Sequence, residues 1–125
     1  MSADDLAVAE EFLAVLAAAA KTGELDDVYE FLLADVEWVT PMRDLRGLGE
    51  LRKEMTWFSP RETLDVDFEV SEARLVDLGS GRIASDFLEI YTAKKTGELA
   101  YARERRIELT VRDGKIARYE MRFAG

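Results

Sequence analysis

The sequence predicts an α+β fold, a cone-shaped barrel in which three N-terminal helices pack on a curved, mostly antiparallel sheet. Two observations predict it. Up to residue 60, most apolar residues recur at helical spacing, interrupted by one short strand that ends at Pro41. From residue 64 onward the period changes from about 3.6 residues to 2, the period of strands. Helices followed by a run of strands favour a sheet that wraps around the helices and encloses a pocket.

The first helix is predicted to begin at a cap formed by Ser2 or Asp4 and to end at Gly23. Glycine is common in the left-handed position that follows a helix. The apolar stripe of this helix is wide enough to be buried on two sides, as in a helix that lies across a sheet. The stripe consists of Leu6, Val8, Ala9, Phe12, Leu13, Val15, Leu16, Ala19 and Ala20.

Two shorter helices and a strand are predicted before residue 64. The second helix covers about residues 24–33, and its apolar face is formed by Leu25, Val28 and Leu32. Residues 35–41 then predict a strand that stops at the proline, and a loop follows. The third helix begins near Gly47 and is closed by Pro60. Its inner face is formed by Leu48, Leu51, Met55 and Phe58.

The strand-rich part begins with a change of phase. Apolar residues alternate through Val66, Phe68 and Val70, but the next apolar positions are Ala73 and Leu75. A slip of one residue in a long strand predicts a bulge. Three turns then predict antiparallel hairpins between consecutive strands. These turns are Gly79-Ser80-Gly81, Thr96-Gly97 and Asp113-Gly114.

Composition excludes several classes of function. The 125 residues are enough for one domain with a real core, and we expect a single domain over residues 1–125. The net charge of -9 argues against binding to nucleic acid or to an anionic membrane surface. The chain has no cysteine and no histidine, which excludes thiol chemistry, histidine-dependent triads and nearly all zinc sites. We therefore expect no metal and no cofactor, and acid–base work by carboxylates, tyrosine, lysine or ordered water.

The N-terminal segment predicts a cytoplasmic protein. Residues 1–5 are acidic, whereas a secretory signal begins with basic residues. The alanine run at residues 17–20 is far shorter than the roughly 20 apolar residues of a membrane span. We therefore expect no membrane partner.

The last two predicted strands give the clearest assignment of faces, because side chains alternate along a strand. In the last strand the inward set is Ala117, Tyr119, Met121 and Phe123. In the strand before it, the inward set is Ile107, Leu109 and Val111, continued by Arg105, Arg103 and Tyr101. Arg103 and Arg105 could hold a carboxylate or enolate oxygen, since guanidinium offers a planar set of donors. Alternatively both lie at the rim, because residues 101–106 are charged on both faces.

For the predicted strand near residue 87, the pattern does not decide which face points inward. One face carries Ile83, Ser85, Phe87, Glu89 and Tyr91. The other face is also rich in apolar residues, namely Ala84, Leu88 and Ile90. Alternation alone therefore does not decide which set faces the pocket.

The whole chain resembles the nuclear transport factor 2-like superfamily, in its SnoaL-type polyketide-cyclase-like, limonene-epoxide-hydrolase-like and ketosteroid-isomerase-like branches. The resemblance covers the order of elements over essentially all 125 residues. It implies a cone-shaped α+β barrel that is often dimeric through the outer face of its sheet. Its local marks are Trp38-Val39-Thr40-Pro41, Arg46-Gly47 and Asp113-Gly114-Lys115-Ile116.

The resemblance also implies site residues. Glu89 matches the position at which epoxide hydrolases of this fold carry a catalytic aspartate, which favours an inward Glu89. Trp38 and Thr40 match positions where those enzymes have a tyrosine and an asparagine that orient water. The chain departs from the pattern at Phe87, where the hydrolases have an arginine, and at Met121, where they have a second aspartate. No known catalytic set of the superfamily is therefore complete in this sequence.

These observations leave two hypotheses for function. In the first, the chain binds a small hydrophobic molecule, with or without an anionic group, and any catalysis is a cofactor-independent isomerisation, cyclisation or hydration. Glu89 would accept a proton, Tyr119 or Tyr91 would donate a hydrogen bond to the developing oxyanion, and Arg103 would steady the anion. In the second, the chain is a non-catalytic homodimeric interaction module.

Each candidate residue also has a purely structural interpretation. Glu89 could form an ion pair with Arg103 or Arg105 that serves only the fold. The aromatic residues could form a wall for a flat ligand, or they could simply be core, since aromatics bury the largest areas. These aromatic residues are Trp38, Tyr91, Tyr119 and Phe123.

Overall fold

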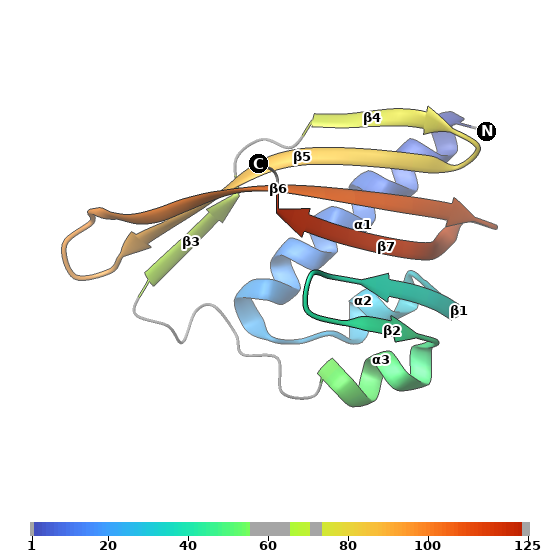
Figure 1. The fold of residues 1–125 in the computed structure, drawn as a ribbon, viewed down its shortest axis with the longest axis horizontal. Helices are drawn as coiled ribbons and strands as arrows, with labels where there is room; N and C mark the ends of the chain where they lie inside the picture. Colours follow the sequence, from blue (N-terminus) through green and yellow to red (C-terminus); the bar gives the residue numbers. More distant parts are fainter. Residues whose placement is uncertain (1, 56–65, 71–73, 124–125) are drawn as a thin grey trace.

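The computed structural model describes residues 2–55, 66–70 and 74–123. Its elements in chain order are α1 (Ser2–Thr22), α2 (Asp26–Glu30), β1 (Leu32–Val39), β2 (Asp44–Arg46), α3 (Leu48–Glu54), β3 (Val66–Val70), β4 (Arg74–Gly79), β5 (Arg82–Ala93), β6 (Leu99–Arg112) and β7 (Lys115–Phe123). The strands of these ranges form one curved sheet, and the helices lie against it (Figure 1). The predicted α+β class is therefore confirmed.

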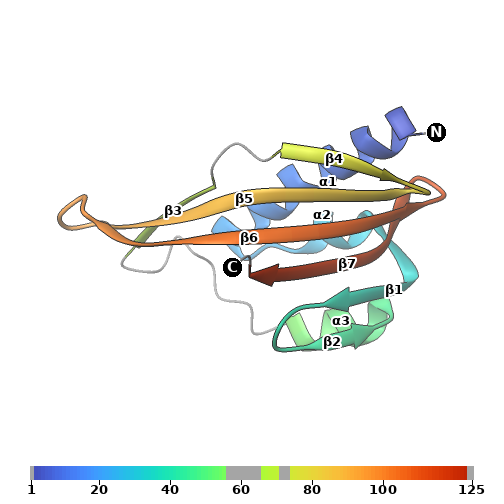
Figure 2. The same cartoon turned by 45° about the horizontal axis from the view of Figure 1, so that its top comes forward.

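The sheet is mostly antiparallel, as predicted. Its strand order is β2-β1-β7-β6-β5-β3, and β4 also pairs with β5. In the described ranges β1 and β7 run parallel, and the other paired strands are antiparallel. Helix α1 crosses one face of the sheet in both views (Figures 1 and 2). The face of β5, β6 and β7 toward α1 therefore has a helix across it, and we call the opposite face the outer face.

The predicted turns end their elements as expected. Asp113 and Gly114 have φ values of 55° and 74°, which suits a two-residue hairpin turn. Gly23 has a φ of 80°, and its N–H donates to the carbonyl oxygen of Ala19 at 2.7 Å. This left-handed residue ends α1 at the predicted place.

Gly81 lies where a side chain does not fit. Its φ is +78°, and a Cβ added to it would lie 2.5 Å from the carbonyl oxygen of Val111. We expect Gly81→Ala to lower the free energy of unfolding by about 2–3 kcal/mol, because the clash adds to the strain of a positive φ. Gly97→Ala is the matched control, since Gly97 has a φ of +73° but no described atom within 4 Å of an added Cβ. Its expected loss is about 1 kcal/mol, and equal losses in urea unfolding would contradict the predicted clash.

The predicted second helix is too long. Helix α2 ends at Glu30, and Leu32 already belongs to β1, where it pairs with Ile116 of β7. The N–H of Ile116 also donates to the carbonyl oxygen of Phe31 at 2.8 Å. Leu32 is buried as the helical spacing suggested, but it is buried by parallel strand pairing. Tertiary pairing therefore overrides the local helical pattern at residues 32 and 33.

The predicted loop before the third helix contains a short strand. Strand β2 pairs with β1 so that Trp38 faces Leu45. Helix α3 begins directly after Gly47, as predicted, and ends at Glu54. The predicted closing residues Phe58 and Pro60 lie outside the described residues.

The register on β5 agrees with the predicted bulge. Val70 of β3 pairs with Glu89, whereas Arg74 of β4 pairs with Asp86. Val70 and Arg74 are four residues apart in the chain, whereas their partners Glu89 and Asp86 are only three apart on β5. The chain that pairs with β5 therefore has one residue more than β5 over this stretch, as at a bulge. Ala73, where the phase slip was seen, lies outside the described residues.

Phe12 of α1 lies at the centre of the core and has no exposed surface. Its ring meets the rings of Phe31, Trp38 and Tyr119 edge to face, with centroid distances of 5.8, 6.4 and 6.4 Å. The helix that crosses the sheet is thus anchored to both β1 and β7. No helix within the described ranges has the length and apolar character needed to cross a membrane.

Candidate functional site

A cavity of about 480 Å³ lies between α1 and the inner face of the sheet. This volume is within the range of small-molecule sites, roughly 300–1,000 Å³. Small residues of α1, Ala14, Ala17 and Ala20, form part of its wall. The described side chains therefore leave the cone hollow rather than filled, a point that the sequence leaves open.

Most of the predicted site residues line this cavity. The structure shows which face of β5 is the inner one, because Phe87 and Glu89 point toward α1 and the cavity. Of the two arginines on the inner face of β6, Arg105 reaches the cavity. The predicted residues in the lining are Trp38, Thr40, Phe87, Glu89, Arg105, Tyr119 and Met121.

Three predicted site residues lie outside the lining. Tyr91 is buried, but its ring stacks on Tyr101 with a centroid distance of 4.3 Å. Phe123 is 44% exposed at the end of β7. Arg103 is exposed, and its guanidinium carbon lies 4.5 Å from the centroid of the Phe123 ring. The rim position considered for both arginines therefore applies to Arg103 and not to Arg105.

Glu89 and Arg105 form a buried ion pair in the cavity wall. Arg105 Nε donates to Glu89 Oε1, and the two side chains are 12% and 8% exposed. In register Glu89 faces Arg103, so its bond to Arg105 is a diagonal contact between β5 and β6. Arg105 Nη1 also lies 3.0 Å from Met121 Sδ. No described group bonds to the other carboxylate oxygen, Glu89 Oε2, which leaves that oxygen available to a ligand.

Tyr119 is another polar residue of the wall. Its ring stacks on Trp38, with centroids 3.9 Å apart and an interplanar angle of 15°. Burial raises the pKa of the Tyr119 phenol well above its ordinary value; the nearby Glu89 charge raises it further and Arg105 partly offsets this. The phenol is therefore a neutral hydrogen-bond donor at physiological pH.

Several lining residues were not assigned to the site from the sequence. Ser85 shares the inner face of β5 with Phe87 and Glu89, and this alternation is the signal that could have found it. Val70 of β3 and Leu75 of β4, two strands that pair with β5, also line the cavity. Ala17 of α1 was assigned only to an alanine run, because a small residue reveals a cavity only when its neighbours are known.

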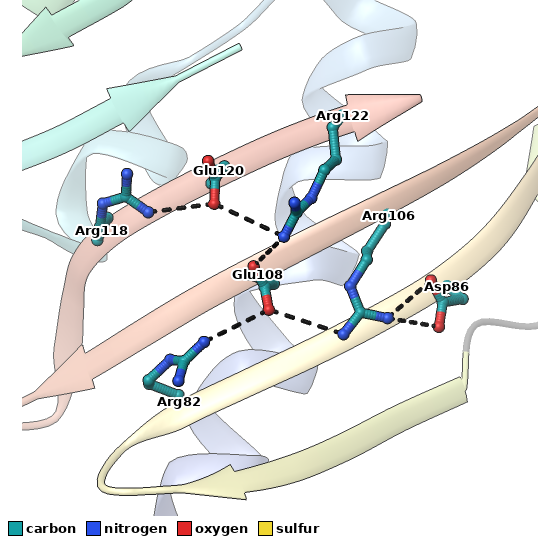
Figure 3. A network of polar contacts seen from close by, with 7 residues as sticks. All are labelled: Arg82, Asp86, Arg106, Glu108, Arg118, Glu120 and Arg122. Carbon is teal, nitrogen blue, oxygen red and sulfur yellow. Dashed lines mark hydrogen bonds and ion pairs between the residues drawn. The ribbon is translucent and has the colours of Figure 1, made fainter. Parts of the chain in front are cut away.

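The outer face of the sheet carries a continuous network of ion pairs (Figure 3). At its centre Glu108 contacts Arg82 and Arg106 at 3.6 Å each, and also Arg122. The network is charge-balanced, with four arginines and four carboxylates. Its members are Arg82, Arg106, Arg118, Arg122, Glu37, Asp86, Glu108 and Glu120. Among the described residues, no group of three or more Asp or Glu side chains could hold a metal ion.

No protein-family model and no curated protein matches the sequence. Solved structures do match the fold. An NTF2-like protein from Anabaena variabilis has a TM-score of 0.77 at 20% identity, over 100% of this chain and 93% of that chain. A candidate isomerase from Bacillus subtilis has a TM-score of 0.71 at 14% identity, over 96% and 88%. A candidate polyketide cyclase from Xanthomonas campestris has a TM-score of 0.69 at 14% identity, over 98% and 92%.

Proposed function

We propose that this chain, which has the nuclear transport factor 2-like fold, binds a small and mainly apolar molecule in the cavity beside α1. We further propose that it acts on this molecule without a cofactor, as an isomerase, cyclase or hydratase. One observation carries the proposal: a largely apolar cavity of about 480 Å³ contains the buried Glu89–Arg105 pair. Apolar walls with a few fixed polar groups are typical of ligand sites. The candidate isomerase and cyclase among the matching structures support this class of reaction.

Glu89 is the proton acceptor in this proposal. Arg105 fixes Oε1 of the carboxylate, and Oε2 remains available to the ligand. A carboxylate held in one orientation can take a proton from the carbon between a carbonyl group and a C=C double bond and return it to the far carbon of that double bond. Such a transfer moves a double bond, and its atoms and electrons balance without an oxidant or reductant.

Tyr119 is the hydrogen-bond donor to the carbonyl oxygen as that oxygen becomes an oxyanion. Its phenol keeps its proton because burial raises its pKa, and Trp38 holds the ring by stacking. A donor positioned for developing charge contributes about 100-fold to such reactions. Glu89 and Tyr119 therefore provide the two functions that a proton transfer next to a carbonyl group requires.

Arg103 extends the proposal to ligands that carry an anionic group. Its guanidinium lies over the rings of Tyr101 and Phe123, and no described carboxylate pairs with it. An arginine without a carboxylate partner can bind a carboxylate of the ligand through its planar donors. Arg103 would act at the rim, outside the cavity that receives the apolar part of the ligand.

Hydrogen exchange in D₂O tests the proposed proton transfer without knowledge of the product. Ketones that raise the melting temperature of the protein are incubated with it, and deuterium at the carbon next to the carbonyl group is measured by NMR. We expect exchange catalysed by the wild type and a loss of about 100-fold or more in Glu89→Gln. Glu104→Gln, on the exposed outer face of β6, is the matched carboxylate control and should exchange like the wild type.

Unchanged exchange in Glu89→Gln, with ligand binding retained, would remove Glu89 from the mechanism. Loss of both exchange and binding would indicate that Glu89 holds the ligand or the cavity rather than the proton. The melting-temperature shift on adding ligand separates these two results.

A homodimeric interaction module is a second candidate, and the charge balance of the outer face favours it. The chain carries a net charge of -9, so two copies repel each other over most of their surfaces. The ion-pair network around Glu108 is locally neutral, so two copies can meet there with less repulsion. We expect a dimer in sedimentation at tens of micromolar and a monomer for Arg122→Glu. A wild-type monomer at that concentration would contradict this candidate.

A further inference from the structure

Ser85 of β5 is a polar group in the cavity wall whose hydrogen-bonding capacity the described residues do not use. It is 1% exposed, and its hydroxyl oxygen has no hydrogen-bond partner among them. Its register partners on the flanking strands are Leu75 and Ile107, apolar residues that also line the cavity. A buried hydroxyl without a partner is unfavourable and uncommon in folded proteins. The space that can supply a partner is the cavity itself.

Ser85 lies well away from Glu89 along the same face of β5. Glu89 follows it by four residues, which separates their Cα atoms by roughly 13 Å. Phe87 lies between them, and Ile107 faces Ser85 from β6. Along β5 the cavity therefore presents the Ser85 hydroxyl and the Glu89 carboxylate with the apolar Phe87 between them, while Tyr119 lines it from β7.

We infer that Ser85 binds the ligand and that the cavity selects elongated apolar molecules with an oxygen at each end. This inference rests on the proposed function and specifies its substrate class. The oxygen near Glu89 and Arg105 belongs to the reacting carbonyl group. The oxygen at Ser85 belongs to a hydroxyl or a carbonyl group, because a serine hydroxyl both donates and accepts hydrogen bonds.

Two matched ketones test the inference: 2-acetylnaphthalene and 6-hydroxy-2-acetylnaphthalene. They share one flat apolar body and one ketone, and only the second carries an oxygen at the far end. We expect the wild type to bind the hydroxy ketone about fivefold more tightly, the value of one neutral hydrogen bond. In Ser85→Ala the two ketones should bind equally, with the dissociation constant that the wild type shows for 2-acetylnaphthalene. Thr110→Ala, which removes a hydroxyl next to Leu109 and opposite Arg82, should keep the preference.

The stability of the ligand-free variant gives an independent readout. Removing an unsatisfied buried hydroxyl should leave the melting temperature of Ser85→Ala equal to or above that of the wild type. A lower melting temperature would mean that the hydroxyl serves the fold, and it would overturn the inference. A preference retained by Ser85→Ala, or absent from a wild type that binds both ketones, would also overturn it while leaving the proposed function intact. Failure of the wild type to bind either ketone, or any other compound of a broad panel, would contradict the proposed function itself.

Discussion

Replacing Arg105 by methionine is expected to lower the free energy of unfolding by about 3–5 kcal/mol. The two side chains of the Glu89–Arg105 pair are 8% and 12% exposed, so the variant leaves a carboxylate buried without its partner. Methionine preserves most of the volume, so the loss reports the unpaired charge more than a cavity. Urea unfolding at neutral pH measures this effect.

Two variants distinguish this explanation from a general effect of losing an arginine. Arg106→Met removes the neighbouring residue, whose side chain is 32% exposed and lies in the outer network, and should cost about 1 kcal/mol or less. The double replacement Glu89→Leu with Arg105→Met removes both charges and should recover most of the stability. If Arg105→Met and Arg106→Met cost the same, the pair is not buried as described.

Phe12→Ala is expected to lower the free energy of unfolding by about 3–5 kcal/mol. The ring is fully buried and contacts three other aromatic rings, so truncation leaves a cavity where α1 meets β1 and β7. The Trp38–Tyr119 stack borders the same ring, so the variant should also loosen the polar wall of the ligand cavity. Chemical unfolding measures the first effect, and a change in the near-ultraviolet circular dichroism, to which Trp38 and Tyr119 contribute, measures the second.

Glu11→Ala is the matched control for Phe12→Ala. Glu11 is the preceding residue of α1 and is exposed, so its replacement should change stability by no more than about 0.5 kcal/mol. A loss of less than about 1 kcal/mol in Phe12→Ala would contradict the central packing of this helix.

Patterns of alternation and turn residues predicted most of the last two strands, but a register shift between Thr110 and Val111 places the buried Ile116, rather than the predicted Ala117, opposite Val111. The period of two along residues 107–111 and 117–123 placed Tyr119 and Met121 on the inner face, where the structure has them. Asp113-Gly114 fixed a hairpin between these strands, since both residues adopt positive φ. Both signals are local, so neighbouring residues suffice to show them.

Elements that depend on distant partners were predicted less well. Leu32 continues the helical spacing of Leu25 and Val28, yet it belongs to a strand because Ile116 pairs with it from the other end of the chain. Strand β2 has three residues and one buried side chain, Leu45, which is too short for alternation to be recognised. Both elements are set by pairing with another strand, and a local sequence pattern does not show which strand that is.

The candidate site shows the same division. Alternation placed Arg103 and Arg105 on one face, and both guanidinium groups lie over the ring of Phe123. Alternation could not show that Arg105 also lines the cavity whereas Arg103 does not. The cavity itself arises from what side chains leave unfilled, as at Ala17. Ser85 becomes conspicuous only once its flanking neighbours, Leu75 and Ile107, are known to offer no hydrogen bond.

A paired thermal-shift screen tests most directly whether the space beside α1 receives a ligand. The panel contains flat hydrophobic acids, enones, steroids and epoxides, and each compound is added to the wild type and to Ala17→Phe. Residue 17 lines the cavity, so the benzyl side chain of the variant should occupy part of the space that the methyl group of Ala17 leaves empty. Circular dichroism of the ligand-free variant verifies that its fold is intact.

A ligand at about 100 times its dissociation constant adds roughly 2.7 kcal/mol, which corresponds to several degrees for a domain of this size. We expect at least one compound to raise the melting temperature of the wild type by that amount and to leave that of Ala17→Phe unchanged. A panel without any shift, or a shift that persists in Ala17→Phe, would contradict the account, because the cavity would then not be where the ligand binds.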